Sequence, residues 1–518
     1  MTGWQHGERR RDKMIISSSL RKLKQIMKYF IFLSAILIGC VNAEPEENTN
    51  ITVGNERLPI EMDLGYISDL FPDEDLSQVV ADALNYLLEE REITVESNVT
   101  QAELNRIERL LATPFAGNQA IAISDLNGLE HLSHLIEFRG DSNQIVDLSP
   151  LANLYNLESL HLGGNNISDL SPLSNLVNLE RLQLERNEIN DIAPLSNLVN
   201  LKNLSLSENE LSDLSPLLTL NNLERIVASE NEVSDLSFLS HLLNLESLSL
   251  SNNEIDDLSY LTKLASLRYL NLNENNIENI DVIANLINLR SLRLDNNYVS
   301  DLSSLSKLGY LNHLHLRNNE LMEIDVLSSL FDLQVLDLSE NSIHDITPLS
   351  DLENIFDLNL SGNEINIIPE LASYYMGILD LSDNNIAELD ALSSHVHLFW
   401  LFLNGNEIIN VSPLRNLRRL HRLDLGHNYI NELSPLSDLN QLLLLNLSYN
   451  SIMTIAPLSN LTNLEWLNID GNDIYDVNSI CYIIANIRLE KQTQHGSWSP
   501  VPLEGMGIVV QELNCLVE

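Results

Sequence analysis

Residues 157–173 read LESLHLGGNNISDLSPL, and this stretch decides the fold because the chain repeats it. From residue 135 onward the pattern L-x-x-L-x-L-x-x-N-x-I-x-D-L-x-P-L recurs, with an asparagine at its ninth position. Sixteen asparagines stay in phase, at intervals of 22 residues and once of 21, between Asn363 and Asn384. They are Asn143, Asn165, Asn187, Asn209, Asn231, Asn253, Asn275, Asn297, Asn319, Asn341, Asn363, Asn384, Asn406, Asn428, Asn450 and Asn472. A fixed period over about two-thirds of the chain predicts a repeat architecture.

Each unit first predicts a short strand and a turn. Leu160 and Leu162 alternate with polar residues, which is the pattern of a strand with one buried face. Asn165 follows at the turn, where a buried amide can hydrogen-bond backbone groups of its own coil and of the next coil. We therefore interpret the sixteen asparagines as a structural ladder and not as ligand-binding residues.

The remainder of each unit predicts a 3-10 turn. Ser171-Pro172 reads as an N-cap followed by proline at the first helical position, and proline recurs at this place in 8 of the 16 coils. A 22-residue coil leaves too little chain for a long α-helix, so we expect short 3-10 turns on the convex side. The predicted fold is an α/β solenoid, a right-handed horseshoe with a parallel sheet on its inner, concave face.

The position four residues after each repeat asparagine is acidic in 12 of 16 coils, as at Asp169 and Asp191. A carboxylate there can accept a hydrogen bond from the backbone of the following turn. A row of carboxylates one strand apart is also an arrangement that can collect calcium. No coil contains the glycine-rich nonapeptide of calcium-binding β-rolls, so the sequence favours capping.

Composition limits the partners. The chain has 518 residues, of which 44% are hydrophobic, with 29 Lys+Arg against 74 Asp+Glu and a formal net charge of -45. Such a surface repels phosphate, which predicts no nucleic-acid partner. Three cysteines exclude a disulfide-dense scaffold and a four-cysteine zinc site.

The N-terminus predicts export. Basic residues between Arg21 and Lys28 precede an apolar run, Tyr29 to Gly39, which is too short to span a membrane because a span needs about 20 residues. Leu37 to Cys40 resembles a bacterial lipobox, so we predict a signal peptide over residues 1–39 and lipidation of Cys40. Cleavage after Ala43, giving a secreted protein, is the alternative, and Met27 is an alternative start that would remove residues 1–26. Residues 40–60 then form an acidic tether.

Both ends of a solenoid need caps, because each end otherwise exposes an apolar edge. Residues 61–115 predict a helical N-terminal cap. Its first helix starts at Asp73, and its second starts at Thr100 with a capping box to Glu103 and buries Leu104, Ile107, Leu110 and Leu111. Sixteen coils over residues 116–475 follow, and residues 476–518 form a short C-terminal cap. Cys481 and Cys515 lie in that cap and suggest a disulfide, with two unpaired buried thiols as the alternative.

The repeat resembles the leucine-rich repeat. The opening at Ile67 to Asp73, the helical cap and coils ending in Asp-Leu-Ser-Pro-Leu resemble the internalins, bacterial surface proteins that bind host or other proteins. The sequence departs from the wall-anchored members, because it has neither an LPxTG-type signal nor an Ig-like segment after the repeats. The resemblance therefore implies a protein-binding surface and leaves the partner open.

The sequence gives no indication of catalysis. It contains no nucleophile elbow, HExxH, Walker loop or GxGxxG motif. Two histidine pairs, His131 with His134 and His313 with His315, have no accompanying cysteine or carboxylate motif, so we interpret them as facing solvent. We expect no enzyme activity, no metal and no cofactor.

Residues six, four and two before each repeat asparagine should lie on the concave face. Coils about 4.8 Å apart would give sixteen coils a surface roughly 70 Å long, which is the scale of a protein partner. The candidate ligand-binding residues are aromatic or charged, with one leucine among them: Trp400, Phe402, Arg422, Asp424, Leu444, Tyr449 and Trp466 in the last coils, with Arg293, His315 and Arg317 in the middle. The alternative for the last coils is that the C-terminal cap covers these rings, or that Arg422 merely stacks on Trp400.

Two functions remain open. One is an extracytoplasmic, lipid-tethered module at the cell surface or in the periplasm, which binds or adheres to a protein or a surface glycan and meets the membrane only through its lipid. The other is a cytosolic regulatory subunit, because the 22-residue coil also resembles phosphatase-regulating leucine-rich repeat proteins.

The N-terminus separates these two functions. Metabolic labelling with a lipid precursor should mark the wild-type protein, and Cys40→Ala should lose the label because the acylated thiol is gone. Unprocessed full-length protein in the cytosol would contradict both the lipobox and the surface location.

Overall fold

The computed structural model describes residues 63–88, 92–113 and 122–475, which belong to one unit, residues 61–518. Several predictions concern residues outside the described ones: the signal peptide, Cys40, the whole tether over residues 40–60, the first two residues of the N-terminal cap, and the C-terminal cap with Cys481 and Cys515. These predictions stay predictions.

The N-terminal cap combines a two-stranded sheet with short helices. Strand β1 (Asp63–Tyr66) pairs antiparallel with β2 (Asn98–Thr100). The helices are α2 (Ile67–Leu70), α3 (Glu74–Leu87) and α4 (Gln101–Leu104). Asp73 caps α3 as predicted, because its side chain accepts hydrogen bonds from the backbone N–H groups of Asp75 and Leu76, each at 3.1 Å. Its other carboxylate oxygen accepts from Ser124 N–H at 2.9 Å and so ties the cap to the first coil.

The second cap helix is shorter than predicted. The capping box of Thr100 and Glu103 is present, but α4 ends at Leu104 and the chain continues into strand β3 (Arg109–Leu111). Because β3 pairs with the first repeat strand, its side chains alternate: Leu110 is buried, whereas Leu111 is 63% exposed. The prediction that Leu111 is buried in a helix is therefore wrong, and the sheet begins inside the segment assigned to the helical cap.

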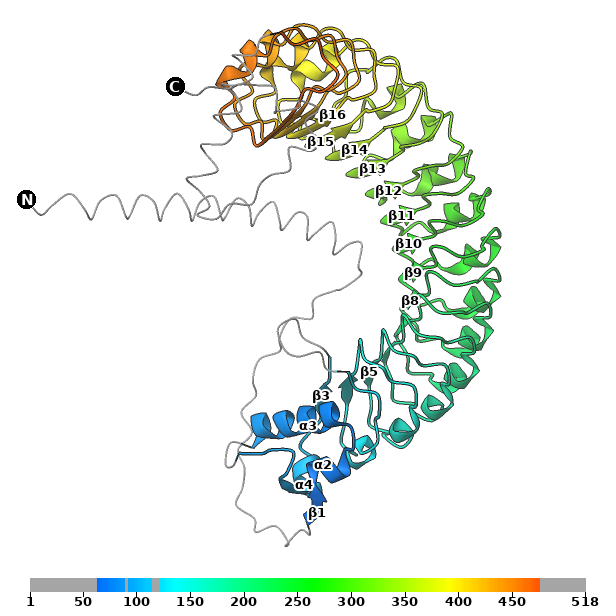
Figure 1. Ribbon diagram of the computed structural model, residues 1–518. Helices are drawn as coiled ribbons and strands as arrows, with labels where there is room; N and C mark the ends of the chain where they lie inside the picture. Colours follow the sequence, from blue (N-terminus) through cyan, green and yellow to red (C-terminus); the bar gives the residue numbers. More distant parts are fainter. Residues whose placement is uncertain (1–62, 89–91, 114–121, 476–518) are drawn as a thin grey trace, which may run out of the picture. The chain divides into compact units, whose positions relative to one another are not determined.

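One parallel sheet runs through the repeats, and each strand pairs with the strand of the next coil (Figure 1). The predicted solenoid with one strand per coil is confirmed. The strands after β3 are β4 (Glu137–Arg139), β5 (Ser159–His161), β6 (Arg181–Gln183), β7 (Asn203–Ser205), β8 (Arg225–Val227), β9 (Ser247–Ser249), β10 (Tyr269–Asn271), β11 (Ser291–Arg293), β12 (His313–His315), β13 (Val335–Asp337), β14 (Asp357–Asn359), β15 (Ile378–Asp380), β16 (Trp400–Phe402), β17 (Arg422–Asp424), β18 (Leu444–Asn446) and β19 (Trp466–Asn468).

Short 3-10 turns lie on the side of the coils opposite the strands, as predicted (Figure 1). They are η1 (Leu129–His131), η2 (Ser149–Leu151), η3 (Ser171–Leu173), η4 (Ala193–Asn197), η5 (Ser215–Thr219), η6 (Ser237–His241), η7 (Ser259–Lys263), η8 (Asp281–Asn285), η9 (Ser303–Lys307), η10 (Asp325–Ser329), η11 (Thr347–Leu349), η12 (Asp390–Ser394), η13 (Ser412–Asn416), η14 (Ser434–Leu436) and η15 (Ala456–Asn460). The repeat leucines between strands and turns are buried and form one continuous core.

The asparagine ladder joins consecutive coils. The side-chain oxygen of Asn297 accepts from Ile277 N–H at 3.0 Å, and its Nδ2 donates to the carbonyls of Leu272 at 2.9 Å and Leu294 at 3.1 Å. The partner coil is the preceding one and not the next one that the sequence reasoning assumed. The residue before each ladder asparagine has a positive φ, and at twelve of these places it is not glycine. The turn therefore accepts a strained backbone wherever glycine is missing.

The acidic position caps the 3-10 turns. The carboxylate of Asp169 accepts from Ser171 N–H at 2.8 Å, and Asp191 does the same with Ala193 N–H at 2.8 Å. Ser171 is the first residue of η3 and its N-cap is Leu170, so the predicted capping role of Ser171 is wrong. Asp169 performs it instead, because a side chain two residues upstream reaches the first N–H of the turn.

The structure contains a second row of asparagines, which our sequence analysis did not predict. Each member lies nine residues before an asparagine of the ladder. In each of them Nδ2 donates to a backbone carbonyl 23 residues earlier, as Asn288 does to Ala265 at 2.8 Å. The row comprises Asn156, Asn178, Asn200, Asn222, Asn244, Asn288, Asn354 and Asn463. The signal was present in the sequence as the pair Asn-Leu, which recurs before seven of the strands.

The single 21-residue coil is irregular on the convex side. Strands β14 and β15 keep the regular pairing, with Asp357 opposite Ile378, and Asn384 still accepts from Ile365 N–H at 2.9 Å. No 3-10 turn forms between these two strands, and Ser373, which is buried, hydrogen-bonds through its hydroxyl to the carbonyl of Ile355. The missing residue is thus absorbed away from the sheet.

The two rows of asparagines should differ sharply in their effect on stability. Asn297→Ala removes the partners of buried backbone groups in two coils and should lower the free energy of unfolding by about 2–4 kcal/mol. Asn288 belongs to the same coil and is exposed to solvent. Asn288→Ala loses one hydrogen bond and should lower the free energy of unfolding by less than about 1 kcal/mol. Urea denaturation of both variants measures the difference, and equal losses would contradict the ladder's role.

Candidate functional site

The register of the last strands brings the predicted column together. Trp400, Arg422, Leu444 and Trp466 each begin a strand, β16 to β19, and each is directly paired with the next. Adjacent strands lie about 4.8 Å apart, so these four side chains form a continuous row. Trp466 is 38% exposed, and Trp400 and Leu444 are half-buried.

Arg422 lies over an aromatic ring, but the ring is not the one considered in the sequence analysis. Its guanidinium carbon lies 4.6 Å from the centroid of the Phe402 ring, and the alternative of stacking on Trp400 stays a prediction. Phe402 ends β16, one strand away and diagonal to Arg422, and a long side chain reaches that diagonal. The arrangement holds a cation against an apolar surface while Arg422 itself remains exposed.

A stacked pair borders the column. The His427 and Tyr449 rings lie 4.4 Å apart at an angle of 17°. Both residues occupy the positive-φ position of their coils, and Tyr449 is 57% exposed. The next coil has Gly471 at this position, where a Cβ would come within 2.6 Å of the Tyr449 ring. Glycine there lets the ring lie flat beside the backbone.

Asp424 is engaged within the sheet. Its Oδ1 accepts from Gly426 N–H at 3.1 Å and from Asn446 Nδ2 at 2.8 Å. Burial raises the pKa of this carboxyl, and these two hydrogen bonds oppose the rise. Asp424 therefore orders the loop after its strand, in addition to lying next to the aromatic column.

The middle of the inner face holds Arg293, His313, His315 and Arg317. Arg293 pairs directly with His315 in the sheet register, and both histidines are half-buried. Burial, together with the Arg293 charge, lowers the pKa of His315 to about 3. The same causes lower the pKa of His313, whose Nδ1 hydrogen-bonds Asn312 Oδ1 at 2.7 Å. The two imidazoles are neutral at physiological pH.

Carboxylates lie on both sides of this cluster. Asp295 accepts from Arg317 N–H at 2.9 Å and from Asn273 Nδ2 at 2.9 Å, yet burial raises its pKa to about 6. Burial and the charges of Asp337 and Asp380 raise the pKa of Asp357 to about 6. Within residues 63–475, apart from the two gaps, no group of three or more histidine, cysteine or acidic residues is arranged to hold a metal ion.

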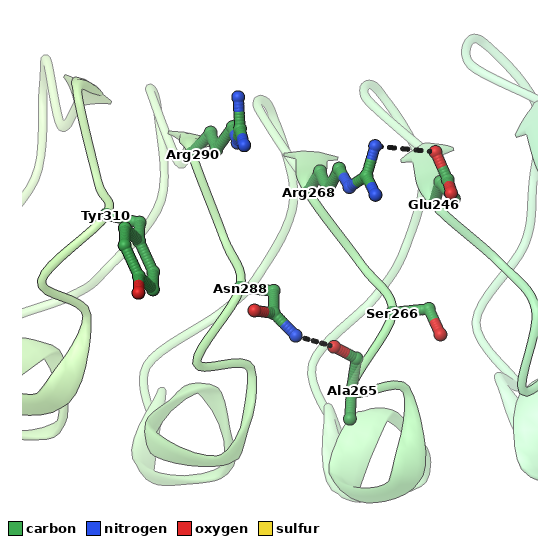
Figure 2. Close-up of a pocket in the computed structure, with 7 residues that line it drawn as sticks. All are labelled: Glu246, Ala265, Ser266, Arg268, Asn288, Arg290 and Tyr310. Atoms are coloured by element: carbon green, nitrogen blue, oxygen red, sulfur yellow. Dashed lines mark hydrogen bonds and ion pairs between the residues drawn. The ribbon is translucent and has the colours of Figure 1, made fainter.

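A shallow groove of about 570 Å³ lies beside the strands that lead into this cluster (Figure 2). Arg268 pairs there with Glu246 at 3.2 Å, and Arg290 is the next arginine along the row. Tyr310 occupies the place that Asn288 has in the preceding coil, so the second asparagine row is interrupted at this point.

A similar interruption exposes rings near the aromatic column. Tyr374, Tyr375 and His397 contact one another with centroids 4.6–5.1 Å apart, and Arg419 hydrogen-bonds His397 at 2.9 Å. Sequence reasoning missed this cluster because it considered only the concave positions. The loss of asparagine from the second row was the available signal.

The comparisons with known protein families and with solved structures both identify leucine-rich repeat proteins. The family described as "Leucine Rich repeats (2 copies)" matches residues 136–175, 155–197, 243–285 and 265–307, and "Leucine rich repeat" matches residues 418–474. No curated protein matches the sequence.

Solved structures extend the match over most of the repeats. An internalin of Listeria monocytogenes is 31% identical, with 74% of this chain and 97% of that chain covered and a TM-score of 0.53. A leucine-rich repeat protein of Leptospira interrogans is 26% identical over 70% of this chain and 98% of that chain, with a TM-score of 0.66. The functional domain of the Listeria protein InlJ, which includes a cysteine ladder, shares the fold at 23% identity over 75% and 82%, with a TM-score of 0.64. Among the described residues, no helix has the length and apolarity of a membrane span.

The crowded carboxylates predict a pH dependence of stability. Asp357 binds its proton more tightly in the folded state than in the unfolded chain, where the pKa is about 3.9. Its contribution is therefore favourable below about pH 4 and is lost as the pH rises through about 6. Asp357→Asn should raise the melting temperature at pH 7 and leave it unchanged near pH 4.

A second aspartate provides the control. Hydrogen bonds from Ser171 lower the pKa of Asp169, so its contribution is present at neutral pH and is lost as the pH falls. Asp169→Asn should lower the melting temperature at pH 7. Thermal denaturation of both variants across this range measures the signs, and two shifts in the same direction would contradict the assignment.

Proposed function

The chain belongs to the internalin-like bacterial leucine-rich repeat proteins, and from this membership we propose that it is a non-catalytic binding module for another protein. The binding surface is the inner face of the last coils. The observation that carries the proposal is the row Trp400, Arg422, Leu444 and Trp466 on four adjacent strands.

The chemistry of this row suits protein recognition. Tryptophan, tyrosine and arginine dominate binding hot spots, because they bury a large area and keep a polar group available. The chain has only 4 tryptophans, and 2 of them lie in this row. A core role alone would leave the partial exposure of Trp466 and Arg422 without a reason.

The rigidity of the row also favours binding. Each side chain starts a strand whose backbone is paired on neighbouring strands, so little conformational entropy remains to be lost on association. Arg422 is further held over Phe402. A pre-formed aromatic surface of this kind suits a folded or extended protein segment better than a small metabolite.

We further propose that the module is exported and tethered to the membrane by lipid on Cys40, with residues 40–60 as a flexible spacer. The support is the basic and apolar leader followed by the lipobox-like Leu37 to Cys40. The alternative, a cytosolic regulatory subunit, requires that this leader is not processed.

Substitution of the row tests the binding surface. Pull-down from membrane or culture extracts should recover a partner with the wild-type chain, and Trp400→Ala and Trp466→Ala should each abolish its recovery. Tyr269→Ala is the matched control, because Tyr269 occupies the same position of its coil and is 51% exposed. It should retain the partner.

Melting temperatures of the same variants separate binding from packing. A ligand-site tryptophan should leave the melting temperature nearly unchanged, whereas a core tryptophan should cost about 3–5 kcal/mol. Retention of the partner by both tryptophan variants would reject the site whatever their stability.

A further inference from the structure

Arg293 lies in the middle of the inner face without an acidic partner. It ends β11, and the register places it between Asn271 of β10 and His315 of β12. Its side chain is half-buried. Among the described residues, the ion pairs within 4.0 Å do not include Arg293, nor do they include the neighbouring Arg290 and Arg317.

Three cations elsewhere along the coils are paired, and the unpaired Arg290 and Arg317 are exposed to solvent, whereas Arg293 is half-buried. Lys202 lies 2.8 Å from Glu180, Arg186 lies 2.6 Å from Glu208, and Arg268 lies 3.2 Å from Glu246. In each case the repeat of 22 residues sets the cation beside a glutamate of an adjacent coil. A chain with 74 acidic residues has ample means to neutralise Arg293 in the same way, and it does not.

The Asp295 carboxylate acts on Arg293 electrostatically but forms no ion pair with it within 4.0 Å, and the other groups around Arg293 are hydrogen-bonding ones. His313 and His315 lie close enough for the Arg293 charge to act on both, and the neutral His315 imidazole can donate one N–H. Ser291, at the start of the same strand, is buried. The nearest carboxylate, Asp295, already accepts hydrogen bonds from Arg317 N–H and Asn273 Nδ2.

A half-buried charge without a partner is unfavourable, and an incoming anion removes the penalty. We propose that Arg293 is the anchor for one carboxylate of the protein partner, from an aspartate, a glutamate or the chain end, with His315 as an additional donor. The guanidinium presents two parallel N–H groups that match a carboxylate. This inference rests on the proposed function and names the chemistry that the partner must bring.

A single carboxylate fits this place better than a phosphate or a polyanion. Asp295, Asp337 and Asp357 lie around the cluster or on the next strands, and the chain as a whole carries a formal charge of -45. This field repels a dianion more strongly than a monoanion. Arg293 can neutralise one negative charge.

Titration with a blocked tripeptide tests the anchor. Acetyl-Gly-Asp-Gly-amide should shift the Nε–Hε resonance of Arg293 in the ¹⁵N-arginine-labelled full chain, with saturation in the millimolar range. Acetyl-Gly-Asn-Gly-amide at the same ionic strength should not. The response should disappear in Arg293→Met and persist in Arg181→Met, which removes an exposed arginine from the same face.

Three results of this titration would overturn the proposal: no response to the aspartate peptide, an equal response to the asparagine peptide, or a saturable response to inorganic phosphate alone. None of them depends on the cellular partner, so they do not bear on the tryptophan row. If the tryptophan variants lose the partner and Arg293→Met retains it at full affinity, the anchor is rejected while the proposed function stands. We expect Arg293→Met to weaken partner binding by about tenfold or more.

The melting temperature provides a second test, because a purely structural role of Arg293 predicts a change of opposite sign. Arg293→Met keeps most of the aliphatic stem and removes the unpaired charge, so its melting temperature should rise. Lys202→Met, which breaks a pair, should leave the melting temperature unchanged or lower it. A clear fall for Arg293→Met would identify Arg293 as a packing residue and overturn the anchor.

Discussion

A buried asparagine amide must find partners for two N–H groups and one oxygen, and in this protein the backbones of two consecutive coils supply them. Asn297 shows the arrangement, with Ile277 and Leu272 on the preceding coil and Leu294 on its own. Because a buried amide without these partners is costly, the distance and register between coils leave little room for variation. Every other regularity, including the strand pairing, the buried leucines and the positions on the inner face, follows from this spacing.

Because the hydrogen-bonded backbone of the strand and the ladder turn is the same in every coil, the exposed residues of the sheet can vary. The residue that precedes each ladder asparagine adopts a positive φ whether it is glycine, glutamate, histidine or tyrosine, so the hydrogen bonding of the turn outweighs the strain. The positions of the sheet that point outward can then change from coil to coil without loss of the fold. Serines, an arginine and histidine cluster and an aromatic row are carried by the same backbone. The second asparagine row likewise tolerates substitution, because tyrosine replaces asparagine at Tyr310 and Tyr375 and the coils keep their strand pairing.

The period of the sequence was enough to predict the strands, the 3-10 turns and which residues share a face, because these depend only on spacing. It was not enough to predict partners of side chains. The ladder amides bond the preceding coil, Arg422 lies over Phe402, and His313 and His315 are half-buried, and each of these depends on side-chain direction between strands. The predicted length of helix α4 was wrong for a related reason. Residues 109–111 have helical spacing in the sequence, but pairing with β4 overrides it.

Two features of the inner face have different physical roles if both meet one partner. Seven strand spacings at about 4.8 Å separate Trp466 from His315, and roughly 40 Å separate it from Arg293, so only a protein-sized ligand covers both. The aromatic row supplies buried area and hence affinity. The central arginine supplies little area, but it is an unpaired positive charge on a strongly acidic molecule, and a misplaced carboxylate meets repulsion elsewhere. The aromatic row in the last coils thus supplies most of the affinity, and Arg293 in the middle coils sets the position of the partner along the solenoid.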